Sequence, residues 1–199
     1  LSDYALPTAR TGGDALAGVI LAELLTGFGL GMLVRLMFLA VSTAGSIVSL
    51  QIGLTSALVA DPSQGGQATV LSRLMSIAAA VVCMALLVHH LWIAALVRSY
   101  ATFPVGGAPA AGDFAELAIR TAGRSLMLAV SLSAPAIVYG VVFNVALGLA
   151  ARLAPAMQVF FVAQPLNITL GLALFAGVGG IMLTAFTTEF AHWLQAGWG

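Results

Sequence analysis

Residues 125–151, SLMLAVSLSAPAIVYGVVFNVALGLAA, form a run of 27 amino acids without a charged side chain. Three similar runs accompany it, since Leu36 to Ala60, Leu74 to Val97 and Leu153 to Thr188 contain 25, 24 and 36 residues without Asp, Glu, Lys or Arg. About 20 such residues in an α-helix, at roughly 1.5 Å each, cross a hydrocarbon layer of roughly 30 Å. Several runs of this length cannot all be core helices of a soluble domain. The sequence therefore predicts an integral membrane protein, or a subunit that buries itself among similar helices.

The composition supports this class and argues against several others. Hydrophobic residues make up 61% of the chain and charged residues 7%, whereas an ordinary globular domain has about 25% charged residues. The seven basic residues are all Arg and the net charge is zero, so we expect no basic patch and no nucleic-acid partner. His89 and His90 point about 100° apart on a helix, and no Cys, His and carboxylate cluster has ligand spacing. We therefore expect no metal site and, because no Ser has the neighbours of a nucleophile, no hydrolase.

The N-terminal half contains a long apolar region followed by a clear loop. The first apolar segment extends from Ala15 to about Val34, and the pattern continues from Arg35 to Ala60, so one long helix and two helices joined by a bend are both possible. We place a break near Gly53. The segment Asp61 to Gln67 is predicted to be a loop, because proline and paired glycines oppose helix and the remaining residues are polar.

The rest of the chain predicts three more helices. The first extends from about Thr69 to Tyr100. The second contains Pro135, which should kink it because proline lacks a backbone donor. Gln164-Pro165 interrupts the last apolar run and leaves Leu166 to about Leu194 as the final helix. Together the segments predict an all-α fold of hydrophobic helical hairpins, several kinked or broken by Pro or Gly, in a single domain over residues 1–199.

Small residues recur at helical spacing in these apolar segments. Such residues let two helix backbones approach closely, which is how apolar helices associate when hydrophobicity cannot drive them. The predicted helix-packing residues are Gly27, Gly31, Gly45, Ser49, Gly140 and Gly148. The pattern supports helix packing and is unspecific about the partner.

Charged residues inside the apolar segments are candidates for a functional role. Glu23 and Arg35 would be costly in lipid, at roughly 2.5 to 3.5 kcal/mol for a central charge. In a transporter Glu23 would carry protons, but we favour a structural role for both residues near a boundary or in a polar contact. Glu116, Arg120 and Arg124 fall at i, i+4 and i+8, so we expect them on one water-exposed helix face.

Twelve short blocks of sequence occur in a fixed order and are distributed over most of the chain. They are Leu50 to Ala57, Asp61-Pro62, Gln67, Val70 to Arg73, His89 to Leu96, Phe103 to Gly106, Ala146 to Leu149, Arg152, Ala154-Pro155, Met157 to Phe160, Pro165-Leu166 and Gly171. In this order they resemble the FliR family of flagellar export-gate proteins. Together they are specific, although each alone is weak. The family usually begins with another hydrophobic hairpin, which this chain lacks, so we expect the start of the native protein to be missing.

The resemblance implies a structural subunit of the flagellar type III secretion export gate. Such proteins assemble with FliP-like and FliQ-like subunits, and with FlhB-like ones, in the bacterial inner membrane within the flagellar basal body. Unfolded flagellar proteins pass through this gate, and lipid surrounds it. The family has no catalytic residues and needs no cofactor. Its apolar helices pack largely against partner subunits.

The resemblance also implies a plug, a loop that helps to close the channel. It maps onto a stretch where the residues themselves predict a helix break and a polar loop. The implied plug residues are Gly53, Leu54, Thr55, Ser56, Ala57, Leu58, Val59, Ala60, Asp61, Pro62, Gly65, Gly66 and Gln67. Family members often carry bulky aromatic residues here, whereas this chain has smaller ones. The chain also departs from the family at Asn167, where Lys is common.

Two alternatives remain beside the flagellar subunit. The first is the sibling SctT subunit of virulence injectisomes, although the block Gly53 to Ala57 with Asp61-Pro62 and Gln67 looks more flagellar. The second is a secondary transporter with a substrate site at broken helices. A transporter should show paired halves and a membrane-embedded ionisable cluster, and neither is visible in the sequence.

Overall fold

The computed structural model describes residues 13–54, 70–102, 111–153 and 159–196. Over these ranges the backbone forms long α-helices, which confirms the predicted all-α class. The helices are α1 (Gly13–Ile52), α2 (Val70–Ala85), α3 (Val88–Thr102), α4 (Ala111–Leu153) and α5 (Val159–Gln195).

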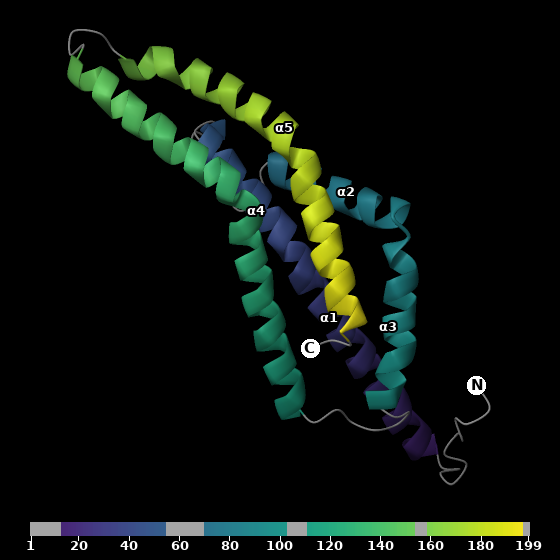
Figure 1. The fold of residues 1–199 in the computed structure, drawn as a ribbon. Coiled ribbons are helices and arrows are strands. Elements are labelled where there is room, and N and C mark those ends of the chain that lie inside the picture. Colours follow the sequence, from purple (N-terminus) through teal and green to yellow (C-terminus); the bar gives the residue numbers. More distant parts are fainter. Residues whose placement is uncertain (1–12, 55–69, 103–110, 154–158, 197–199) are drawn as a thin grey trace.

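Three long helices lie along one another, and a bent pair of shorter helices lies beside them (Figure 1). Helices α1 and α4 run in the same direction, since the Ser125 hydroxyl donates to the Leu36 carbonyl at 2.5 Å and Gly140 lies against Gln51 further along. Helix α5 runs back along both. Helix α2 crosses the bundle, and the chain bends by 81° between α2 and α3, so that α3 lies beside the long helices.

The core is built around α1, and most of its largest buried side chains come from α1 and α5. Leu33, Met37 and Val41 of α1 are fully buried, as are Phe186, Phe190 and Trp193 of α5. The Phe38 ring packs edge-on against Phe186 and Phe190, with centroids 5.3 Å apart in both pairs. Edge-to-face packing of this kind stabilises aromatic pairs by roughly 0.5–1.5 kcal/mol beyond the burial of their area.

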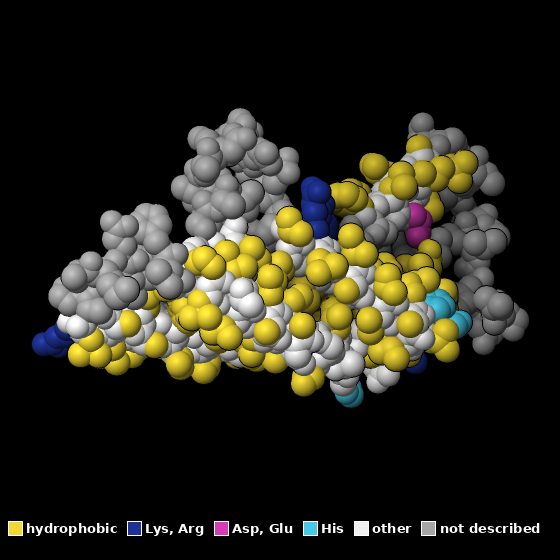
Figure 2. Space-filling model, turned by 90° about the horizontal axis from the view of Figure 1, so that it is seen from above, with side chains coloured by type: hydrophobic (Ala, Val, Ile, Leu, Met, Phe, Trp, Pro, Cys, Tyr) yellow, Lys and Arg dark blue, Asp and Glu magenta, His cyan; other side chains and the backbone are white. Residues whose placement is uncertain are grey.

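Much of the remaining surface is apolar. Figure 2 shows hydrophobic side chains distributed over the face seen from above, with few charged groups among them. Within the part of the chain that the structure describes, three helical segments are long and apolar enough to cross a membrane, namely Leu16–Ile52, Gly112–Leu153 and Ala163–Gln195. A soluble monomer rarely exposes contiguous apolar area on this scale, so the chain requires lipid or other subunits around it.

Two predicted features of the long helices are confirmed. Helix α1 is continuous across Arg35, so of the two possibilities the single long helix is correct, and it ends at Ile52, beside the break placed at Gly53. Helix α4 continues through Pro135 and is visibly bent in Figure 1. Pro135 cannot donate to the carbonyl of Ser131, and the Ser133 hydroxyl donates back to the carbonyls of Ala129 and Val130 at 2.9 and 3.1 Å. Both features favour bending of a helix.

Two other predictions were wrong. The single helix expected from Thr69 to Tyr100 is divided into α2 and α3 at Leu86–Leu87, although neither Gly nor Pro is present there. The last helix was expected to begin at Leu166, but α5 begins at Val159 and continues through Pro165. A proline removes one hydrogen bond from a helix without ending it where neighbouring helices support the backbone.

In the described ranges, two ion pairs involve charged residues of α4, and the sequence predicted only the one within the helix. The Arg120 guanidinium lies 2.6 Å from the Glu116 carboxylate, and both side chains are exposed, as expected for neighbours on one face. Arg124 instead pairs with Glu189 of α5 at 3.1 Å. Glu23 is partly buried in a polar pocket that Ser99 and Tyr100 of α3 also line.

Candidate functional site at the end of α1

The end of α1 brings the beginning of the predicted plug into contact with α5. Gly53 has φ +82°, in the left-handed region that glycine adopts most readily. Its N–H donates to the Leu50 carbonyl at 3.2 Å, which tightens the last turn. A Cβ at this position would lie 2.9 Å from Nε2 of Gln164, the movable end of a side chain, so it is the backbone conformation that requires glycine.

Side-chain amides from α5 complete the hydrogen bonding of this helix end. The last carbonyl groups of an α-helix have no partners within the helix. Nδ2 of Asn167 donates to the Gln51 carbonyl at 3.3 Å, and Nε2 of Gln164 donates to the Gly53 carbonyl at 3.5 Å. The polar groups of one helix thus fix where another helix ends.

Tyr139 of α4 orients the Asn167 amide. Its hydroxyl lies 2.8 Å from Oδ1 of Asn167 and 3.0 Å from the Asn167 carbonyl, so its proton can be donated to either oxygen. Because Oδ1 accepts from Tyr139, Nδ2 is turned towards Gln51. Asn167 is 9% exposed, and in such a setting each unpaired polar group would be costly. We call Gln51, Gly53, Tyr139, Gln164 and Asn167 the polar anchor.

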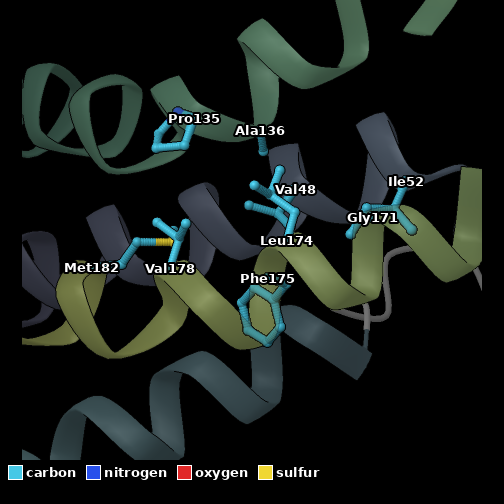
Figure 3. A pocket seen from close by; sticks show the side chains of 9 residues that line it. All are labelled: Val48, Ile52, Pro135, Ala136, Gly171, Leu174, Phe175, Val178 and Met182. Carbon is cyan, nitrogen blue, oxygen red and sulfur yellow. The ribbon is translucent and has the colours of Figure 1, made fainter.

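The packing beside the polar anchor is close and apolar. Gly140 of α4 lies against the Gln51 side chain, and Gly171 of α5 lies against Ile52. Figure 3 shows side chains of α1, α4 and α5 around a small apolar space next to Ile52 and Gly171. The space has a volume of about 10 Å³, which is close to the minimum for one water molecule, and its apolar lining offers that water no partner. The helices therefore hold the polar anchor in a well-packed setting.

The structure places the predicted plug residues only at their beginning. Gly53 and Leu54 are described, and Leu54 is half-buried against the core. The other predicted plug residues, Thr55 to Gln67, lie outside the described residues. What can be built from the described chain is thus the attachment of the plug segment to the bundle.

The predicted helix-packing residues fall into two groups. Gly45, Ser49 and Gly140 are buried within this chain, and a Cβ on Gly45 would lie 2.7 Å from Cα of Ser72 in α2. Close approach there also lets the Ser72 hydroxyl donate to the Ser42 carbonyl at 2.8 Å. In contrast, Gly27, Gly31 and Gly148 are exposed, and a Cβ on any of them would meet no atom within 4 Å.

Sequence reasoning missed most of the polar anchor. The sequence pattern gave Gln164 only as part of a predicted helix interruption and Asn167 only as a departure from the family. It assigned no role to Tyr139. One signal was available, because all three are polar side chains within charge-free runs, where hydrogen-bonding groups need a partner. Among the described residues, no group of three or more His, Cys, Asp or Glu could hold a metal ion.

Comparison with known proteins identifies relatives over nearly the whole chain. The sequence profile of the bacterial export proteins, family 1, matches residues 2–193. The flagellar biosynthetic protein FliR of Caulobacter vibrioides is 43% identical over 161 residues, which cover 81% of this chain and 64% of that protein. FliR of Escherichia coli is 37% identical over 158 residues, covering 78% and 60%. FliR of Bacillus subtilis is 32% identical over 149 residues, covering 73% and 58%. The chain thus spans less than two thirds of the length of these relatives.

Proposed function

This chain belongs to the FliR family of bacterial export proteins, and we propose that it forms a structural subunit of the flagellar type III export gate, through which unfolded flagellar proteins are translocated. The observation that carries the proposal is the family match over residues 2–193. The relatives named above are flagellar proteins, which favours the flagellar gate over the injectisome. The proposed location is the bacterial inner membrane, within the flagellar basal body.

The apolar surface supports assembly with other subunits. Beyond Gly140, α4 exposes Val141, Val145, Leu149 and Leu153, so its last turns make few contacts within this chain. The exposed Gly148 lies on the same stretch and would allow a foreign helix to approach closely. We propose FliP-like and FliQ-like subunits, with FlhB-like ones, as the proteins that cover such surfaces, and lipid for what remains.

The polar anchor suggests how a plug would be held. In the proposed gate the segment Gly53 to Gln67 helps to close the channel. Gln164 donates to the carbonyl of its first residue, Gly53, and Asn167, which Tyr139 orients, donates to the carbonyl of Gln51 two residues before it. The plug would therefore leave the bundle at a fixed point and in a fixed direction. A plug held in this way would limit the leak of protons or ions through the resting gate.

Co-purification tests the proposed function directly. The full-length protein is co-expressed with FliP-like and FliQ-like subunits of the same bacterium, and a tag on the FliP-like subunit is used for purification in detergent. We expect a particle of defined mass that contains all three proteins. A transporter or a membrane enzyme would leave the tagged subunit without this chain, and that result would overturn the proposal.

A further inference from the structure

The corner between α2 and α3 is strained. Helix α2 ends at Ala85, α3 begins at Val88, and the two axes differ by 81°. Leu87 has φ 59°, and among the described residues other than glycine it alone has a positive φ. The left-handed conformation brings Cβ close to the following carbonyl oxygen, so it is unfavourable for leucine.

Local sequence does not require this corner. From Val70 to Thr102 the chain contains neither Gly nor Pro, and taken alone it predicts one continuous helix. The side chains of Leu86 and Leu87 are 57% and 59% exposed, so their own packing does not hold the backbone in place. At the corner the Leu86 N–H donates to the Val82 carbonyl at 2.9 Å and the Leu87 N–H to the Met84 carbonyl at 3.2 Å. The His90 N–H donates to the Leu87 carbonyl at 3.1 Å.

Contacts on either side of the corner hold it instead. Met75 and Ala79 of α2 are buried in the core, and so are Val88 and Ala95 of α3. At the far end of α2, Ser72 is fixed to α1 by its hydrogen bond to Ser42. The strain at Leu87 is therefore imposed by docking of both helices, and undocking α3 would remove the reason for it.

We propose that Val70–Thr102 is a two-state element, bent at Leu86–Leu87 when α3 is docked and a single straight helix when α3 is released. The two states differ in reach. A straight helix of these 33 residues measures about 50 Å, which is enough to cross a hydrocarbon layer of roughly 30 Å. The separate halves, of 16 and 15 residues, measure only about 24 and 22 Å, so neither spans the layer. Bending thus converts a spanning segment into two that do not span.

The distance between two exposed positions distinguishes the states. Spin labels are placed in the full-length protein at L74C and V97C, in a Cys83→Ala background, and the protein is reconstituted in lipid nanodiscs. From the helix rise of about 1.5 Å and the 81° angle, the backbone separation is roughly 26 Å when bent and roughly 35 Å when straight. Pulsed electron spin resonance resolves this difference of about 9 Å.

Substitutions at the corner should move the population in opposite directions. Leu87→Gly removes the left-handed strain, whereas the matched control Leu86→Gly lowers helix propensity without that relief. The population ratio of the bent to the straight state should therefore be about fivefold to thirtyfold higher in Leu87→Gly than in Leu86→Gly. Leu87→Val should favour the longer distance compared with Leu86→Val, because a β-branched residue tolerates positive φ poorly.

A third variant acts away from the corner. Ala95 is 1% exposed, so Ala95→Leu overpacks the α3 contact and should also populate the separation of about 35 Å. A distance that stays at about 26 Å in Leu87→Val and in Ala95→Leu would overturn the two-state proposal. A broad distribution without a peak at the longer distance would overturn it as well, since it would indicate a flexible joint.

Discussion

Replacing Gly45 with alanine should separate α1 from α2. A Cβ on Gly45 would lie 2.7 Å from Cα and 3.1 Å from the backbone nitrogen of Ser72. These are backbone atoms, so no side-chain rotation can relieve the contact. The helices must move apart by about 1 Å to restore an ordinary van der Waals separation of roughly 3.5–4 Å. A movement of that size stretches the 2.8 Å hydrogen bond from the Ser72 hydroxyl to the Ser42 carbonyl beyond effective length.

The free energy of this change follows from three terms. Overpacking a well-packed contact costs typically 1–3 kcal/mol, and loss of the hydrogen bond costs about 1 kcal/mol. Alanine stabilises a helix interior by about 1 kcal/mol relative to glycine, which offsets part of the loss. We therefore expect Gly45→Ala to lower the free energy of unfolding by about 1–3 kcal/mol.

The matched control is Gly31→Ala in the same helix. A Cβ there would meet no atom within 4 Å, so only the helix-propensity term of about 1 kcal/mol remains and the variant should be as stable as the parent or more stable. The stability of both variants is measured by unfolding the purified full-length protein with sodium dodecyl sulfate in mixed micelles. Tryptophan fluorescence follows the unfolding, because Trp193 is 1% exposed and reports on the core. Equal midpoints for Gly45→Ala and Gly31→Ala would refute the packing argument.

Three other predictions concern the polar anchor, the plug and the assembly. Asn167→Leu leaves the Gln51 carbonyl without its side-chain donor, so it should lower the free energy of unfolding by about 1–3 kcal/mol in the same assay. The control Thr169→Val loses only a hydrogen bond within α5 and should lower it by less than about 1 kcal/mol. Deleting residues 53–67 should leave co-purification with the partner subunits largely intact and make the channel leak small ions, so an unchanged conductance in planar bilayers would argue against a plug in this segment. Expressed without partners, the protein should aggregate or require detergent, and a monodisperse particle without detergent in gel filtration would contradict the role assigned to its apolar surface.

The sequence by itself was sufficient for the class of the fold and for one important boundary. The charge-free runs are long enough to cross a membrane as helices. They predict long helices because the backbone must satisfy its own hydrogen bonds wherever water is absent. The end of α1 at Gly53 was also predictable, since glycine tolerates the left-handed conformation that ends a helix. The bend at Pro135 follows from a missing donor. Each of these features depends on one residue type or on the length of one segment.

Only the tertiary structure decided which residues meet. The polar anchor joins Gln51 to Tyr139 and Asn167, which are distant in sequence, and Arg124 pairs with Glu189 rather than with a neighbour on its own helix. The corner at Leu87 has no local signal, because the force that bends the chain comes from docking of α2 and α3 on other helices. Helix formation is a local property, whereas partner choice and strain depend on how whole helices pack.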